Sequence, residues 1–262
     1  MRGFWRRKDA TAAAAALWKF RTLSTATACR AVVLPRFGGP EVLEFRSSVE
    51  VPDLKPQEVL VRARAISINP LDLRVRSGYG RSIFEPLLPL ILGRDVSGEV
   101  VAVGASVSSL VLGQEVFGAL HPTAVRGTYA DYCILSEEEL SVKPSSVSHV
   151  EASAVPFAAL TAWRALKCTA RISEGQRLLV LGGGGAVGLS AIQLAVAAGC
   201  SVSTICGSKS IERVMEVGAE DAIDYKTEVM NFRVSLKLRK KLAVVWPALT
   251  LALDICFKYF FF

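Results

Sequence analysis

The sequence predicts an α/β fold in which a β-rich first part is followed by part of a doubly wound parallel sheet. Short β-branched segments, broken by glycine and proline, extend to about Pro144. After Pro156 the pattern changes to an apolar strand, a glycine-rich turn and a helix, and then to strand, helix and strand. This second alternation is typical of the start of a parallel nucleotide-binding sheet.

The first predicted domain covers residues 30–155. Its apolar segments are short, they contain alternating or β-branched residues, and turn residues such as those of 38–40 separate them. We therefore expect a compact β-rich domain, with strands near 31–34, 42–45, 59–68, 96–103 and 116–120.

The second predicted domain covers residues 156–226. A helical period over 158–167 precedes the fully apolar strand, and each later helix ends at a glycine. The predicted order is strand 177–181, turn 182–188, helix 189–198, strand 201–206, helix 209–217 and strand 222–224.

Composition and charge exclude several classes of protein. The chain has 262 residues, of which 51% are hydrophobic and 21% charged, so it is neither a disordered chain nor a small disulfide scaffold. The net charge of +7 belongs to the ends, because residues 1–30 carry +6 and 226–262 carry +5, whereas 31–225 carry −4. This distribution argues against nucleic acid as a partner. The six cysteines form no CxxC pair, which predicts no disulfide and a reducing compartment.

Both ends of the chain differ from the middle in composition and charge. Residues 1–28 are basic and hydroxylated with a single acid, which is typical of a transit peptide, and we expect mitochondrial localisation with plastid as the alternative. The tail 227–262 places the basic cluster 239–241 before an uncharged run, 242–253, that is shorter than the ~20 residues of a membrane-spanning helix. Membrane association through this tail stays open as a second interpretation.

The glycine-rich turn carries the first functional prediction. Gly183, Gly185 and Gly188 have the GxGxxG spacing between an apolar strand and a helix, which is the context that the motif requires. Gly183 would adopt the angles of the tight turn, Gly185 would leave room for a dinucleotide pyrophosphate, and Gly188 would let the helix approach the strand. The alternative is a tight turn without a ligand.

The end of the second strand indicates which dinucleotide binds. An NAD site has an acid there for the ribose hydroxyl. This chain has Gly207, Ser208 and Lys209 instead, with no acid before Glu212. A hydroxyl and a cation favour a 2′-phosphate, so we predict NADPH as the cofactor. The alternative is that Lys209 is a solvated helix residue without a ligand.

Several segments then resemble the medium-chain dehydrogenase/reductase superfamily, in its zinc-free quinone oxidoreductase branch. The resemblance covers about residues 30–226, and its motifs keep both sequence and order. They are Asn69-Pro-Leu-Asp72, Arg76-Ser-Gly-Tyr79, the GRDVSGEVVAVG string at 93–104, Leu160-Thr-Ala-Trp163, the glycine turn and Ala222-Ile-Asp-Tyr225.

The resemblance implies a GroES-like domain followed by a Rossmann domain. It also implies cofactor contacts beyond those that the spacing predicts. These are Gly184, Ala186 and Val187 in the turn, Gly207 and Tyr225 at the adenosine end, and Asn69 and Thr161 at the nicotinamide end.

The reaction that the resemblance implies is zinc-independent hydride transfer from NADPH to a quinone or another conjugated carbonyl. Asn69 and Arg94-Asp95 occupy the positions where zinc-dependent relatives carry ligands, and His121 and His149 are expected in surface loops. No catalytic proton donor is assigned; Tyr79 and Arg74 are the guesses that remain.

The family pattern stops after Tyr225, which predicts a C-terminally truncated chain. Only three strands precede the tail, so we expect an incomplete Rossmann domain whose first strand, 177–181, is an exposed apolar edge. Part of the nicotinamide and substrate site would then be missing, and the chain could be inactive. The alternatives are a non-catalytic module that binds a nucleotide or a partner, and a membrane-tethered protein; a homodimer also stays open.

Overall fold

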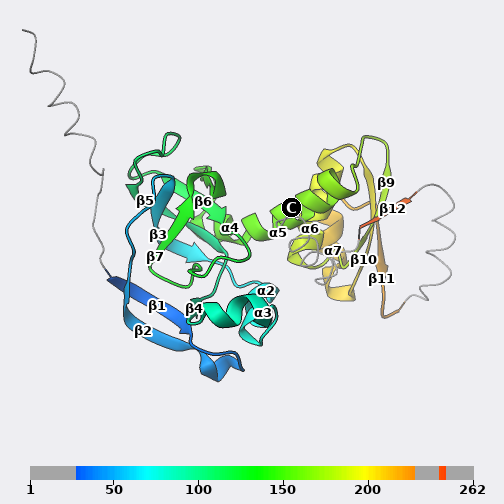
Figure 1. Cartoon of the computed structure of the whole chain (residues 1–262). Helices are drawn as coiled ribbons and strands as arrows, with labels where there is room; N and C mark the ends of the chain where they lie inside the picture. The colour runs from blue at the N-terminus through cyan, green and yellow to red at the C-terminus, as the bar shows by residue number, and fades with distance from the viewer. Residues whose placement is uncertain (1–27, 228–241, 246–262) are drawn as a thin grey trace, which may run out of the picture. The chain divides into compact units, whose positions relative to one another are not determined.

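Two β-rich regions and a parallel sheet make up the described part of the chain, residues 28–227 and 242–245 of a computed structural model (Figure 1). The chain divides into two compact units, Met1–Ala154 and Val155–Phe262. Each unit is described by itself below.

The first unit is built on a five-stranded antiparallel sheet with the order β7-β3-β5-β6-β8. Its interior is formed by β-branched and leucine side chains, among them Val59, Val96, Val116 and Leu135. Burial of these side chains explains why the short apolar segments form strands. The strands are β3 (Glu58–Ile66), β5 (Asp95–Val103), β6 (Glu115–Ala119), β7 (Tyr132–Ser136) and β8 (Leu140–Val142).

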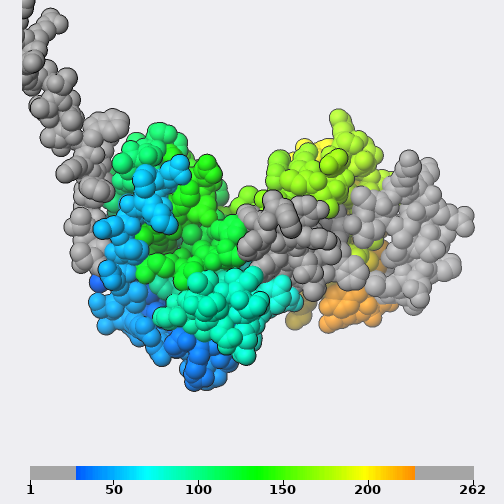
Figure 2. Space-filling view, in the orientation of Figure 1, coloured from blue at the N-terminus to red at the C-terminus, as the bar shows by residue number. Residues whose placement is uncertain are grey.

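A second, three-stranded antiparallel sheet in this unit has the order β2-β1-β4. It contains β1 (Ala28–Leu34), β2 (Glu44–Glu50) and β4 (Leu90–Ile91). The turn that joins β1 to β2 contacts the segment after β3, because Gly38 donates a backbone hydrogen bond to Arg76 O at 2.9 Å. Figure 2 shows the two segments adjoining at the surface, in blue and cyan.

The first unit also contains helices, which the prediction of strands and turns missed. Helix α2 follows Asn69 and begins at Pro70, where the missing N–H costs nothing, and Asn69 N–H donates to Asp72 Oδ2 at 2.8 Å. The helices are α2 (Pro70–Arg76), α3 (Arg81–Phe84) and α4 (His149–Ala154), with 3₁₀ turns η1 (Pro40–Val42), η2 (Glu85–Leu87) and η3 (Glu137–Glu139).

The second unit is a parallel sheet with the order β11-β10-β9-β12. Figure 1 shows its helices beside one face of this sheet, where the apolar side chains of α6 pack on β9 and β10. The strands are β9 (Arg177–Leu181), β10 (Ser201–Cys206), β11 (Asp221–Asp224) and β12 (Leu242–Val245). The helices are α5 (Pro156–Trp163), the π-helix η4 (Arg164–Thr169), α6 (Ala186–Ala197), the 3₁₀ turn η5 (Ser208–Ser210) and α7 (Ile211–Glu216).

Strand β12 corrects one prediction. We expected β9 to be an exposed edge, but Leu242–Val245 pairs with it in parallel, and Ala243 lies opposite Leu178. The fourth strand therefore comes from the tail that the family pattern does not include. The predicted α/β architecture, a β-rich domain followed by part of a parallel sheet, agrees with the observed order of the elements.

Among the described residues, no helix combines the length and the apolar composition that a membrane-spanning segment needs. The transit segment and most of the tail, which carry the predictions of targeting and membrane association, lie outside those residues.

Candidate functional site

The glycine-rich turn lies between the carboxyl end of β9 and the start of α6. Gly182 N–H and Gly183 N–H both donate to Ile205 O, at 2.8 and 3.1 Å, which ties the turn to β10. Gly185 is the N-cap of α6, and the amides of the next turn have no partner inside the helix. Three N–H groups and the positive end of the helix dipole therefore gather at one point, which suits an anion.

Glycine occupies each position of the turn for a different structural reason. A Cβ on Gly183 would collide with Thr204 Oγ1, and one on Gly188 would collide with Gly182 O, so packing requires both glycines. A Cβ on Gly185 would meet only Gly182 O, at 3.6 Å, which is an ordinary contact. Neither packing nor backbone angle (φ −86°) requires glycine at 185. Its absent side chain instead leaves space beside the free amides.

One detail of the predicted turn is wrong. We expected Gly183 to adopt the special backbone angles, whereas Gly182 does so, with φ +80°. The predicted close approach of the helix at Gly188 agrees with the observed geometry. Gly184 lies in this turn, and Ala186 and Val187 are the first two residues of α6.

The predicted adenosine end lies at the carboxyl ends of β10 and β11. Gly207 follows β10, and a Cβ there would lie 3.3 Å from the hydroxyl of Tyr225, which is 53% exposed. Ser208 and Lys209 are exposed in η5. The structure thus brings four predicted residues, Gly207, Ser208, Lys209 and Tyr225, to one edge of the sheet.

Sequence reasoning missed an acid at this edge. Ser208 Oγ donates to Asp224 Oδ2 at 2.5 Å, and Lys226 N–H donates to Asp224 Oδ1 at 2.9 Å. These bonds, that of Ser208 above all, lower the pKa of Asp224. Asp224 comes from the neighbouring strand, so the spacing within the second strand gave no signal of it.

The two residues assigned to the nicotinamide end lie in different units. Thr161 lies in α5, and its hydroxyl donates to Phe157 O at 2.7 Å, which leaves its oxygen as an acceptor. Asn69 lies in the first unit and is 9% exposed.

The side chain of Asn69 is held in one orientation. Its Nδ2 donates to Asp95 Oδ2 at 2.8 Å and to Ser67 Oγ at 3.1 Å. A carboxylate only accepts hydrogen bonds, so the nitrogen must face Asp95. Asn69 Oδ1 therefore faces the backbone N–H of Asp72, in the capping box that begins α2.

The first unit also contains a buried charged group, Arg94. Arg94 is 1% exposed, its Nη1 donates to Ala124 O at 2.8 Å, and its Nε has no hydrogen-bond partner. Burial lowers the pKa of Arg94 to about 10, and Asp72 opposes this shift by its charge. Burial also raises the pKa of Asp72, although Tyr129 Oη donates to its Oδ2 at 3.1 Å.

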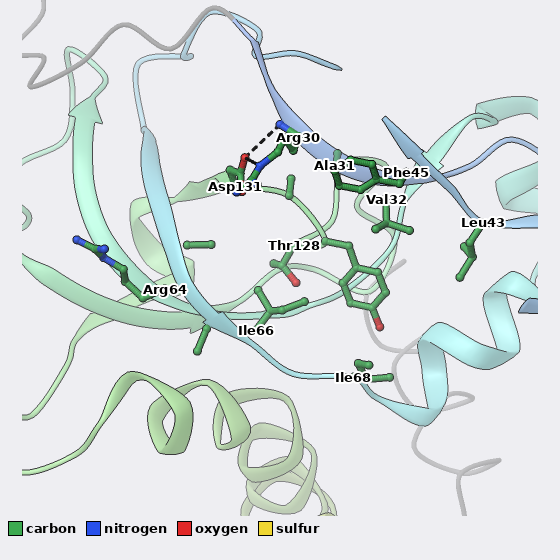
Figure 3. A pocket seen from close by; sticks show the side chains of 14 residues that line it. Arg30, Ala31, Val32, Leu43, Phe45, Arg64, Ile66, Ile68, Thr128 and Asp131 are labelled. Carbon is green, nitrogen blue, oxygen red and sulfur yellow. Dashed lines mark hydrogen bonds and ion pairs between the residues drawn. The ribbon is translucent and has the colours of Figure 1, made fainter. Parts of the chain in front are cut away.

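An open cavity of about 540 Å³ lies in the first unit (Figure 3). Its lining is mostly apolar, and Phe45 and Ile68 beside it are 69% and 72% exposed. Its lining includes the ion pair of Arg30 Nε with Asp131 Oδ2, at 2.8 Å. None of the predicted cofactor residues lines this cavity, although Ile68 directly precedes Asn69.

Local contacts define the surroundings of the two histidines. His149 begins α4 rather than lying in a loop, and its ring contacts Ser97 Oγ at 2.8 Å and Glu115 Oε1 at 3.1 Å. His121 Nδ1 lies 2.7 Å from Thr123 Oγ1 in a loop, as expected. Across residues 28–227, no three His, Cys, Asp or Glu side chains form a group that could hold a metal ion.

The two guesses for a proton donor lie close together in the first unit. Tyr79 N–H donates to Arg74 O at 2.9 Å, directly after α2, and both residues are half-buried. These contacts assign neither side chain a chemical role.

Similarity to a known domain family defines the class of protein. Residues 55–145, which include β3 to β8, match the family model of the alcohol dehydrogenase GroES-like domain. A GroES-like domain followed by a parallel sheet with a glycine-rich turn defines the medium-chain dehydrogenases and reductases.

The particular family follows from a solved structure. The quinone oxidoreductase of Coxiella burnetii is 30% identical, with a TM-score of 0.73, and the match covers 83% of this chain and 68% of that one. The chain belongs to the quinone oxidoreductase family of medium-chain dehydrogenases/reductases.

Two curated relatives support the same family. The mitochondrial NAD(P)H oxidoreductase RTN4IP1 of Mus musculus is 37% identical over 81% of this chain and 61% of its own length. The quinone oxidoreductase of Homo sapiens is 35% identical over 75% of this chain and 59% of its own. The chain thus spans about three-fifths of the length of these relatives.

Proposed function

We propose that this chain binds NADPH and acts as a zinc-independent oxidoreductase that transfers hydride to a quinone or another conjugated carbonyl. The observation that carries the proposal is the turn after β9, where Gly185 leaves space that packing does not require. Family membership supports the same activity.

The residues of the turn fit the diphosphate of a dinucleotide. The amides of Ala186, Val187 and Gly188 would donate to its oxygens, and the dipole of the 12-residue helix α6 favours its charge. Bound there, NADPH supplies the hydride. The protein's own contribution at this end is to bind and orient the cofactor.

The preference for NADPH rests on Ser208 and Lys209. Lys209 is exposed after β10 and would pair with a 2′-phosphate. The Asp224 carboxylate beside Ser208 works in the opposite direction, because it places a negative charge near the same phosphate. The ratio of the dissociation constants for NADPH and NADH measures which charge dominates.

The acceptor is a quinone or an enone because these need no Lewis acid. Hydride addition to a conjugated carbonyl spreads negative charge over several atoms, and neutral donors stabilise that charge. At the nicotinamide end, Thr161 and Asn69 would help to position the cofactor, and the proton donor is not assigned.

The test combines binding and turnover. Fluorescence titration of the full chain with NADPH should show saturable binding, and NADPH absorbance should fall on addition of a quinone but not of a simple ketone. No saturable binding would overturn the proposal.

A non-catalytic binding module is the second candidate, and the four-stranded sheet favours it. A complete Rossmann sheet has six strands, and β11-β10-β9-β12 supplies four in the described ranges. NADPH binding without turnover of any quinone or enone would select this alternative.

For localisation we propose residues 1–28 as a mitochondrial transit peptide, with the plastid as alternative. The relatives named above include a mitochondrial protein, and a chloroplastic alkenal/one oxidoreductase of Arabidopsis thaliana is 35% identical. Fusion of residues 1–28 to a fluorescent protein, followed by microscopy, tests which organelle this segment targets. Membrane attachment by the tail 227–262 predicts carbonate-resistant pelleting that is lost on its deletion.

A further inference from the structure

Strand β9 lies between β10 and β12, and its amides divide between them. Gly182 N–H donates to Ile205 O at 2.8 Å, and Ser201 N–H donates to Gln176 O at 2.9 Å, so even-numbered residues of this segment face β10. Successive residues of a strand point their backbone groups to opposite sides. The odd-numbered residues, Leu179 among them, therefore face β12.

Without β12 these groups would lose their partners. Leu179 is buried, and a buried backbone N–H or C=O without a hydrogen bond is unfavourable. The pairing runs from Leu242 opposite Arg177 to Val245 opposite Val180. The tail strand thus pairs with four of the five residues of β9, from Arg177 to Val180.

The order of the strands gives this pairing a functional meaning. From β9 the chain proceeds to β10 and β11 on one side, and β12 lies on the other side. In open parallel sheets, ligands bind outside the carboxyl ends of the strands where the order reverses. That point lies between β9 and β12, next to the turn at Gly182–Gly185.

We propose that residues 242–245 are a substitute fourth strand, and that dinucleotide binding by this chain requires it. The inference rests on the proposed function, since it takes the nicotinamide dinucleotide as the ligand. The tail, which matches no family motif, would by this pairing hold β9 and its turn in place and form one side of the crevice.

The register provides a matched pair of variants. Ala243 lies opposite Leu178, which faces β10, so in a parallel ladder Ala243 N–H points at β9 and Val244 N–H points away. Ala243→Pro removes a ladder donor. Val244→Pro places proline where an edge strand tolerates it. The two variants otherwise make the same kind of change.

Amide hydrogen exchange by NMR tests the strand itself. In the wild-type chain, Leu179 should be protected as well as Val180, whose amide faces β10. Ala243→Pro should speed exchange at Leu179 by about tenfold or more and leave Val180 within about threefold, whereas Val244→Pro should change neither by more than that. If wild-type Leu179 exchanges like an unpaired amide, the pairing is refuted, even if neither variant folds.

NADPH titration of the same proteins tests the ligand. Ala243→Pro should weaken binding at least about fivefold, and Val244→Pro should bind within about twofold of the wild type. Equal affinity for both variants, with Leu179 deprotected only in Ala243→Pro, would overturn the functional part of the inference. Absence of NADPH binding by the wild type, with Leu179 protected, would instead overturn the proposed function.

Discussion

Two glycines of the same turn should respond in opposite ways to alanine. At Gly185 the backbone is extended and a Cβ meets only one atom at 3.6 Å, so Gly185→Ala should change the free energy of unfolding by less than about 1 kcal/mol. The new methyl group, however, occupies the space that the pyrophosphate needs. Losing one charge-assisted hydrogen bond to a phosphate oxygen costs about 1.5–3 kcal/mol, which is about a tenfold to hundredfold loss of NADPH affinity.

Gly188→Ala is the matched control. Its Cβ would collide with Gly182 O and lie 2.7 Å from Gly183 Cα, so α6 must move away from β9. Overpacking of this kind costs about 1–3 kcal/mol and should lower the Tm by roughly 2–12 °C.

The assay is a fluorescence titration with NADPH beside a calorimetric melt of each protein. Gly185→Ala should bind NADPH more weakly and keep the Tm of the wild type, whereas Gly188→Ala should have a lower Tm. If Gly185→Ala binds NADPH as tightly as the wild type, the turn is a structural connection only, and the reasoning fails.

Three further outcomes follow from local contacts. Thiol titration of the native chain should modify exposed Cys168 at once, whereas Cys133, whose pKa burial raises to about 12, should react only after denaturation. Asp224→Asn should lower the free energy of unfolding at neutral pH, because the folded state holds the pKa of Asp224 below its ordinary value. The difference from the wild type should vanish as the pH falls below 4 and the carboxylate becomes protonated. A difference in the free energy of unfolding that does not change with pH would contradict this. His149→Ala removes both hydrogen bonds of the ring and should cost about 1–3 kcal/mol in urea denaturation, and an unchanged midpoint would show that these contacts do not stabilise α4.

The parts of the fold that local sequence encodes were predictable. The strand at 177–181, the glycine turn and helix α6 form one continuous segment, and each has its own apolar period or turn residue. Helix α2 was also signalled, by Asn69, Pro70 and Asp72, but its seven residues are too few to show a helical period.

Other features depend on contacts between distant segments. The tail run 242–253 has apolar composition without a decisive period, and only pairing with β9 makes Leu242–Val245 a strand. Asp224 reaches Ser208 because β10 and β11 are neighbours, with Cys206 opposite Asp224 in the ladder. No spacing rule within either strand could have predicted that contact.

The position of β12 late in the chain has a consequence for biosynthesis. Leu242 pairs with Arg177, which precedes it by 65 residues. At a translation rate of about 5–20 residues per second, roughly 3–13 s separate the emergence of the two strands. During that interval the nascent chain carries an apolar strand with one bare edge, which is a template for pairing with other polypeptides. The yield of this protein in a cell should therefore depend on chaperones that shield the growing chain until residues 242–245 are made.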